Sequence, residues 1–259
     1  MNLIDTHTHL FLEQFENDWQ EVIQRAIDQN VTKMLLPAIE SKSYPAIKKL
    51  CETFPENCFP MTGLHPCSVG DNFEKELDLV YANLKNKVMN WVAVGEIGTD
   101  LYWDKTFINQ QKEALAQQIE WAKEFQLPIV IHVRDSFDET FEVIDKLNDN
   151  NLTGVFHCFT GTKEHADHIL SYGGFKLGIG GVVTFKNSGV DKIIEQIDVE
   201  HLILETDSPY LTPAPHRGQR NESAYVNLVA KKLSEIYDLP LAKIAEITTK
   251  NANNLFKLS

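Results

Sequence analysis

Two histidines separated by one residue stand close to the start of the chain, in the sequence Asp5-Thr6-His7-Thr8-His9. In an extended backbone, residues i and i+2 point to the same side, so both imidazoles could bind one metal ion. An H-x-H pair alone is more often two solvent-facing polar residues. Asp5 lies on the same face, where we expect it to orient one imidazole from behind.

Other candidate ligands lie at the ends of apolar segments. Glu96 occurs in VAVGEIG, where an unpaired carboxylate would be costly, and Asp207 follows the segment LILET. His132 and His157 end the segments IVIH and GVFH. Each residue alone is explained by a buried ion pair or hydrogen bond, but their shared position at segment ends favours one common site.

Four imidazoles and two carboxylates are too many ligands for one tetrahedral ion. We therefore expect two divalent ions, which at about 3.5–4 Å apart can activate a shared water for hydrolysis. One ion is expected on His7, His9 and Asp207. The other is expected on His132 and His157, with Glu96 bridging the two. No G-x-S-x-G nucleophile signature is present.

These side chains need a framework that brings distant segments together. Eight apolar, β-branched segments alternate with amphipathic ones, which predicts strands at 3–7, 32–38, 58–66, 91–98, 128–134, 153–159, 174–181 and 201–207. A helix is predicted over 107–126, and two more follow Asn221. Eight strand–helix units predict a single α/β domain over residues 1–259, a (β/α)8 TIM barrel with C-terminal helices. An open doubly wound sheet is the competing topology. In a barrel, the candidate ligands would meet at the C-terminal ends of the strands.

The composition narrows the class of protein. The 259 residues carry a formal net charge of −13, which argues against sequence-independent coating of duplex DNA but not against an enzyme that binds phosphate through metal ions. The four cysteines form no C-x-x-C pair, and neither a signal peptide nor an apolar membrane span is evident. We expect a cytoplasmic protein with no membrane association, and we infer no stable protein partner.

Seven motifs in order, IDTHTHL, GLHP, VGEIGTD, IHVRDS, HCFTG, LETDSPYLTP and HRGQRN, resemble the TatD family of metal-dependent deoxyribonucleases in the amidohydrolase superfamily. The resemblance runs from residue 4 to about residue 221. It implies a Mg²⁺-dependent DNase with 3′-5′ exonuclease action on single-stranded or damaged DNA, through a hydroxide activated by two metal ions. The implied metal ligands are His7, His9, Glu96, His132, His157 and Asp207.

The resemblance also implies roles beyond metal binding. Asp207 would carry the proton, which makes it a catalytic residue together with Glu96, and His65 would contact the scissile phosphate. Thr99, Leu101 and Ser223 depart from the usual GEIGLDYYW and RGKRNEP patterns and leave the substrate preference open.

Residues at the expected rim are candidates for substrate contact. Arg134 is either a phosphate ligand or the partner of a carboxylate such as Glu205 or Asp135. Arg217 and Arg220 form a basic loop that is a candidate for binding the DNA backbone. The aromatic residues Tyr102, Trp103 and Phe159 are either base-stacking or packing residues.

Two other functions remain compatible with these residues. The same metal centre could hydrolyse a small ester, lactone or amide, because one fold supports many substrates. A non-catalytic, metal-dependent binding protein is the alternative of another class. The metal is also open: the resemblance implies Mg²⁺, whereas imidazole ligands suit Zn²⁺, Mn²⁺, Fe or Ni²⁺.

Overall fold

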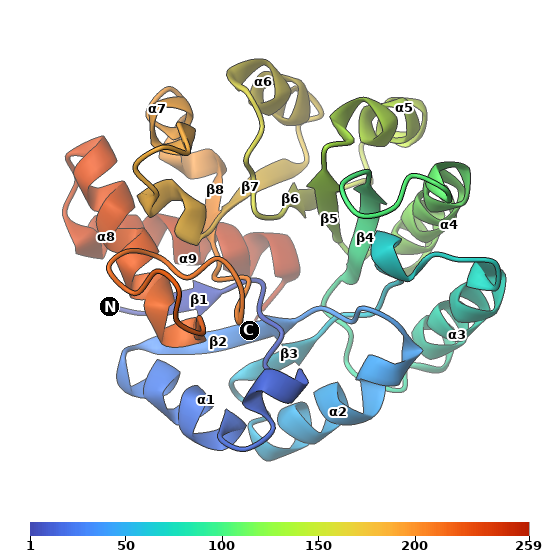
Figure 1. Cartoon of the computed structure of the whole chain (residues 1–259), viewed down its shortest axis with the longest axis horizontal. Coiled ribbons are helices and arrows are strands. Elements are labelled where there is room, and N and C mark those ends of the chain that lie inside the picture. Colours follow the sequence, from blue (N-terminus) through green and yellow to red (C-terminus); the bar gives the residue numbers. More distant parts are fainter. Residues whose placement is uncertain (259) are drawn as a thin grey trace.

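Eight parallel strands alternate with helices around a common centre in the computed structural model, which describes residues 1–258 (Figure 1). The strands are β1 (Leu3–Asp5), β2 (Val31–Leu36), β3 (Cys58–Pro60), β4 (Val94–Asp100), β5 (Ile129–Arg134), β6 (Gly154–Phe156), β7 (Phe175–Ile179) and β8 (Leu202–Leu204). The prediction of an α/β TIM barrel is confirmed.

Regular strand pairing forms two parallel sheets, ordered β1-β2-β3 and β4-β5-β6-β7-β8. Single bridges join their edges, between Thr62 and Val94 and between Thr8 and Ser208. Backbone hydrogen bonds reinforce both seams, including Thr6 N–H to the Leu204 carbonyl oxygen at 3.0 Å. The eight strands therefore lie in one ring.

The helices form the outer layer (Figure 1). They are α1 (Trp19–Asp28), α2 (Tyr44–Thr53), α3 (Phe73–Asn86), α4 (Ile108–Phe125), α5 (Phe137–Leu147), α6 (Lys163–Ser171), α7 (Val190–Ile194), α8 (Val226–Tyr237) and α9 (Leu241–Phe256). Helix α4 buries a stripe of Gln111, Leu115, Ile119 and Ala122 against the barrel. Such a 3.6-residue period is what directs one face of a helix to a core.

The interior of the barrel has an apolar layer below the candidate ligands. Val130 and Val155 stand two residues before His132 and His157, so the period of a strand points all four side chains inward. Helix α9 packs Ala252 and Phe256 against this layer. The layer consists of Ile4, Leu35, Met61, Val92, Ala93, Val130, Val155 and Ile203. One end of the barrel is thus sealed by hydrocarbon, and the polar residues occupy the other.

The strands are mostly shorter than predicted. Strand β1 ends at Asp5 and β8 ends at Leu204, so His7, His9 and Asp207 lie in the segments just after them. Strand β4 is displaced along the chain, because it begins at Val94 and continues to Asp100, beyond the predicted end at residue 98. Among residues 1–258, no helix combines the length and apolar composition that crossing a bilayer requires.

Candidate metal centre

The segments after β1 and β8 run side by side and are tied together through their backbones. Asp207 N–H donates to the His7 carbonyl oxygen at 2.9 Å, and His9 N–H donates to the Ser208 carbonyl oxygen at 2.8 Å. The start of the chain is therefore anchored, with His7 completely buried and His9 nearly so. Extended backbone here directs both imidazoles inward, as the spacing predicted.

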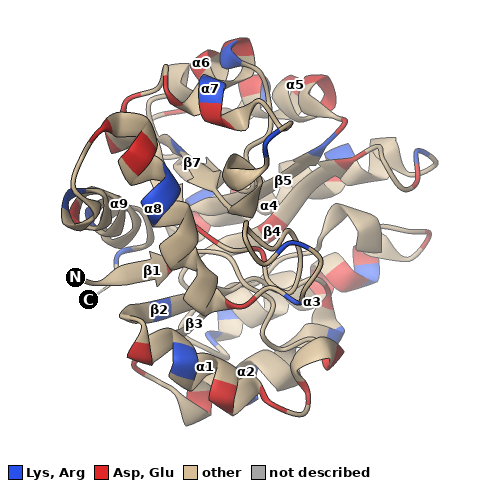
Figure 2. Cartoon of the chain, turned by 60° about the vertical axis from the view of Figure 1, so that its left-hand side comes forward, with Lys and Arg blue, Asp and Glu red and all other residues tan. Residues whose placement is uncertain are grey.

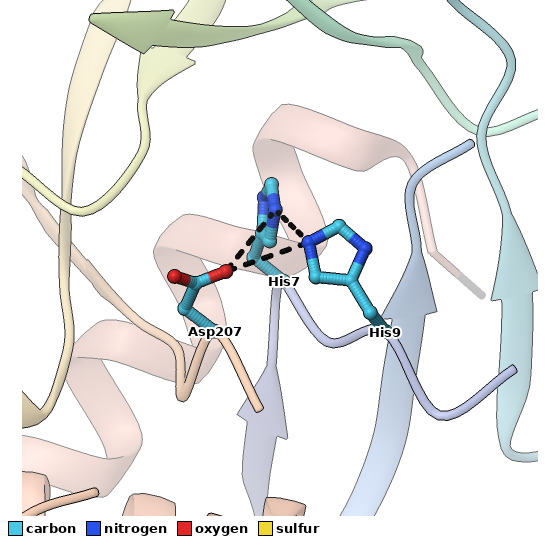
Figure 3. A group of neighbouring side chains, drawn as sticks. All are labelled: His7, His9 and Asp207. Carbon is cyan, nitrogen blue, oxygen red and sulfur yellow. Dashed lines mark hydrogen bonds and ion pairs between the residues drawn. The ribbon is translucent and has the colours of Figure 1, made fainter. Parts of the chain in front are cut away.

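His7, His9 and Asp207 converge on one point (Figure 3). The Nε2 atoms of the two histidines lie 3.3 Å apart, and Asp207 Oδ1 is 3.8 Å from His7 Nε2 and 3.4 Å from His9 Nε2. The Nδ1 atoms of both rings are buried without a hydrogen-bond partner. When both rings carry their proton on Nδ1, the two Nε2 lone pairs and Asp207 Oδ1 face one another, and such a donor set fits a metal ion.

Glu96 reaches the centre because strand β4 bulges at this residue. The pairing with β5 skips it, since Gly95 pairs with Val130 and Ile97 with Ile131. The Glu96 N–H donates instead to the Ala38 carbonyl oxygen, at 3.1 Å, beyond the end of β2. A bulge of this kind re-aims one side chain, here into the barrel.

The two carboxylate oxygens of Glu96 face different histidines. Oε2 lies 3.1 Å from His7 Nε2 and 3.5 Å from His9 Nε2. Oε1 lies 2.9 Å from His132 Nδ1 and 2.8 Å from His157 Nε2. The structure thus brings all six predicted ligands together, divided in the way that two ions with a bridging carboxylate would require.

Two carboxylates outside this set face the histidines of the second group, Asp100 within hydrogen-bond distance of His132 and Glu205 within ion-pair distance of His157. Asp100 Oδ2 lies 2.8 Å from His132 Nε2, which places the ring proton there and leaves the Nδ1 lone pair facing Glu96. Glu205 Oε1 lies 3.5 Å from His157 Nδ1 and also accepts the Cys158 N–H. Gly178 makes room for Glu205, because a Cβ atom there would stand 2.3 Å from Oε2.

His65 also belongs to this cluster, with Nε2 3.4 Å from Glu96 Oε1. Its Nδ1 accepts the Cys67 N–H at 3.0 Å, so a neutral ring carries its proton on Nε2. Burial lowers the pKa of His65, which keeps the ring neutral. An Nε2–H group donates hydrogen bonds and does not ligate a metal, which fits the predicted phosphate contact better than membership of the ligand set.

Burial and charge compete throughout the cluster. Burial opposes ionisation of Glu96, but the nearby imidazoles of His157, His65 and His7 hold the pKa of Glu96 well below its usual value. Burial likewise disfavours imidazolium, yet Glu96 and Glu205 raise the pKa of His157 well above its usual value. Burial lowers the pKa of His7. Metal ligation requires neutral imidazoles, so an ion entering the site must displace protons.

Neighbouring groups lower the pKa values of Asp207 and Asp100. Burial opposes the ionisation of Asp207, but its hydrogen bond with His9 and the charges of His157 and His7 lower its pKa. Burial likewise opposes the ionisation of Asp100, but hydrogen bonds from His132 and from two backbone N–H groups lower its pKa to about 2. Both carboxyl groups are therefore anionic at neutral pH.

The interpretation of Asp5 is wrong, and the choice left open for Phe159 falls to packing. Among residues 1–258, Asp5 contacts no imidazole: its carboxylate accepts the N–H and hydroxyl of Thr206, at 2.9 and 2.7 Å, and so ties β1 to the end of β8. Phe159 is buried in the core against Phe137, with ring centroids 6.2 Å apart, and cannot stack on a base.

The predicted arginines take different positions. The Arg134 guanidinium lies 3.6 Å from the Tyr102 ring centroid, and among residues 1–258 it pairs with neither Glu205 nor Asp135. Arg217 lies 3.4 Å over the Phe185 ring. Arg220 is a structural residue, since it forms an ion pair with Asp18 at 2.6 Å. Arg134 and Arg217 remain candidates for substrate contact.

Sequence reasoning assigned no role to Asp100 and did not connect Glu205 with His157. Both acids occur within recognised motifs, GEIGTD and LETD, and a carboxylate near the end of an apolar strand was the available signal. Which histidine each would contact depends on neighbouring strands, so spacing alone could not reveal it.

The barrel and its converging histidines and carboxylates form the architecture of a metal-dependent hydrolase. Residues 4–257 match the family model described as TatD related DNase, and the chain belongs to the TatD family. It is 36% identical over 258 residues to the uncharacterized metal-dependent hydrolase YabD of Bacillus subtilis, covering 99% of this chain and 100% of that one. The TatD homolog YjjV of Escherichia coli K12 has a crystal structure that matches with a TM-score of 0.93 at 29% identity, covering 99% of this chain and 98% of that chain. A TatD-family hydrolase structure from Entamoeba histolytica shares the fold, with a TM-score of 0.88 at 21% identity over 100% of this chain and 99% of that one.

Proposed function

We propose that this hydrolase is a DNase that cleaves phosphodiester bonds at single-stranded or damaged 3′ ends with the help of two divalent metal ions. The observation that supports it most directly is the position of Glu96, whose two oxygens face two separate groups of imidazoles. A carboxylate between two ligand groups is the arrangement of a bridging ligand. The family model, described as a DNase, supports the choice of substrate.

The residues that would hold the two ions are His7, His9 and Asp207 for one, His132 and His157 for the other, with Glu96 shared. Bound divalent ions supply Lewis acidity, lowering the pKa of coordinated water and stabilising negative charge on phosphoryl oxygens. Four imidazole ligands favour Zn²⁺, Mn²⁺, Fe or Ni²⁺ over Mg²⁺, which prefers oxygen donors.

In this proposal, Asp207 moves the proton. Its contacts with His7 and His9 both use Oδ1, and Figure 3 shows the other carboxylate oxygen pointing away from the two rings. The lowered pKa of Asp207 keeps this oxygen unprotonated, so it can accept a proton from attacking water and return it to the leaving oxygen. In the same proposal, His65 Nε2–H donates to a phosphoryl oxygen, as the tautomer set by the Cys67 N–H allows.

The surface charge is consistent with an enzyme that binds chain ends. Asp and Glu residues are distributed over the outer helices together with Lys and Arg (Figure 2), and the excess of acids, a net charge of −13, disfavours binding of a duplex backbone to the outside of the barrel. Arg134 lies at the C-terminal end of β5, and Arg217 lies in the loop between β8 and α8. A substrate that reaches the site end-on meets these two cations rather than the acidic flanks.

The proposed function is tested by DNA hydrolysis with Mg²⁺ or Mn²⁺, comparing the wild type with Glu96→Ala and Asp207→Asn. We expect each substitution to lower kcat/KM by at least about 100-fold, while Glu56→Ala, at an exposed and distant position, leaves it unchanged. Equal hydrolysis by wild type and both variants would show that these residues do not carry the activity.

A second candidate is hydrolysis of a small ester, lactone or amide at the same centre, which the net charge of −13 favours because such substrates carry little negative charge. A panel of oligonucleotides, lactones, esters and amides separates the two. A protein that keeps its ions and hydrolyses none of them would be the metal-dependent binding protein. A cytoplasmic location stays a prediction, with which the four unpaired cysteines agree.

A further inference from the structure

Exposed aromatic and apolar side chains gather beside the metal centre. Among residues 1–258, seven large hydrophobic side chains are exposed, and four of them follow strands that carry candidate ligands. Trp103 and Tyr102, 71% and 52% exposed, follow β4, whereas Tyr210 and Leu211, 49% and 37% exposed, follow β8. Exposed apolar surface concentrated at one site indicates a binding surface rather than chance.

The loop with Tyr102 and Trp103 is held directly to a candidate ligand. Asp100 Oδ2 contacts His132 Nε2 at 2.8 Å, while Asp100 Oδ1 accepts the N–H groups of Tyr102 at 2.9 Å and Trp103 at 3.3 Å. One carboxylate therefore fixes the aromatic residues relative to the metal centre. The backbone that carries the exposed rings is therefore tied to the candidate ligand His132 through Asp100.

The two rings and a cation form a compact unit. Tyr102 and Trp103 pack edge to face, with centroids 4.9 Å apart and planes at 89°. The Arg134 guanidinium lies 3.6 Å from the Tyr102 ring centroid and 5.5 Å from that of Trp103. Since Arg134 forms no ion pair within residues 1–258, its charge is available to an anionic ligand.

A single exposed aromatic residue, Tyr210, lies beside the first group of ligands. Tyr210 N–H donates to the Asp207 carbonyl oxygen at 2.9 Å, and the Tyr210 ring lies 6.4 Å from that of His9. Exposed aromatic residues thus follow both β4 and β8, one pair anchored through Asp100 and Tyr210 through Asp207.

We propose that Trp103 and Tyr102 form a stacking subsite for an unpaired nucleobase, with Arg134 binding a phosphate of the same strand. This proposal rests on the proposed nuclease function and names the feature of the substrate that the site selects. A base within a duplex has both faces covered by its neighbours, so only a single-stranded or frayed end can offer a face to Trp103. Stacking of this kind tolerates any base sequence.

The subsite is tested with pairs of single-stranded oligonucleotides that differ only in an abasic residue at one of the first three positions from the 3′ end. The wild type is expected to prefer the complete oligonucleotide, in kcat/KM, by about 5- to 150-fold at one of these positions. Trp103→Ala is expected to lose this preference, and Trp103→Phe to retain most of it. Leu79→Ala, an exposed apolar residue of α3, is the matched control and retains the wild-type ratio.

The outcomes separate the two proposals. If the wild type degrades DNA but shows no preference, or if Trp103→Ala keeps the preference, the stacking subsite is wrong and the nuclease function stands. If the wild type degrades neither oligonucleotide, the nuclease function fails, and the subsite fails with it.

The role of Arg134 has a separate measurement. With a labelled phosphorothioate single strand that resists cleavage, Arg134→Ala is expected to reduce the slope of log Kd against log salt by about 0.7, the value for one phosphate contact. An unchanged slope would exclude Arg134 from the subsite.

Discussion

Replacement of Asp100 by asparagine tests whether a carboxylate outside the ligand set controls the metal centre. The amide of Asp100→Asn would keep an oxygen that can accept the N–H groups of Tyr102 and Trp103, so the loop conformation is retained. The substitution would remove the charge that faces His132 Nε2 at 2.8 Å. The amide nitrogen would then face His132 Nε2 in place of Oδ2. The substitution therefore replaces a charged acceptor with a donor, and it favours the ring tautomer that carries its proton on Nδ1.

Two independent considerations give the same size of effect. A hydrogen bond to a charged group contributes about 1.5–3 kcal/mol. Removing the partner of a metal-ligating histidine typically costs about 10–100-fold in metal affinity, which is about 1.4–2.7 kcal/mol. Because Asp100 has a pKa of about 2, its charge is fully present at any pH near neutrality, so the whole effect should be visible there.

The assay is a titration of metal-free protein with Mn²⁺ or Zn²⁺, followed by binding and by hydrolysis. Asp100→Asn should raise the Kd of the more affected ion about 10–100-fold. Asp104→Asn is the matched control, because Asp104 lies in the same loop, is exposed, and accepts only the Thr106 N–H at 2.8 Å. Equal metal affinity in wild type and Asp100→Asn would refute the role of Asp100 in holding His132.

Three other outcomes are expected. His7→Ala should lower the metal content of the loaded protein from two ions to about one per chain by elemental analysis, and full retention of both would refute the assignment of His7. Glu205→Gln should weaken metal binding about 10–100-fold, because it removes the charge that faces His157. Gly178→Ala should have the same effect, because its Cβ atom would displace the Glu205 carboxylate. Wild-type metal affinity in both variants would show that His157 needs no such support. Phe256→Ala should lower the free energy of unfolding by about 3–5 kcal/mol in denaturant titrations, since Phe256 is buried under the barrel, and a change below about 1 kcal/mol would contradict that packing.

The strand alternation and the convergence of the six candidate ligands were predictable because both depend on local pattern. A strand has a period of two, so an apolar segment that ends in histidine or carboxylate predicts both the strand and the direction of its last side chain. The barrel then brings those ends together, as it does for His132 and His157. Strand lengths were less predictable, because a strand ends where its neighbour stops pairing with it.

Contacts set by the relation between strands escaped prediction. In the register of β4 and β5, Gly98 pairs with His132. Asp100 follows Gly98 by two residues and points to the same side, so its carboxylate reaches the His132 ring. Phe159 does not point to the same side as His157, two residues earlier, because Cys158 between them adopts a positive φ of 46°. The chain turns there, and Phe159 is directed out of the barrel into the core beside α5.

Residues with a left-handed backbone fall into two groups, one at the ends of helices and one at the open end of the barrel that carries the candidate ligands. Left-handed residues such as Gln126 and Lys257 end helices, which is a usual way for a helix to stop. Asp135, Cys158, Asp207 and Leu211 also have positive φ, but they follow β5, β6 and β8 at the open end of the barrel. Unfavourable conformations of this kind persist only where surrounding structure holds them, and here they direct candidate catalytic and substrate-binding side chains. The apolar layer over α9 supplies the stability that lets the opposite end of the same strands keep buried charge and an uncommon backbone.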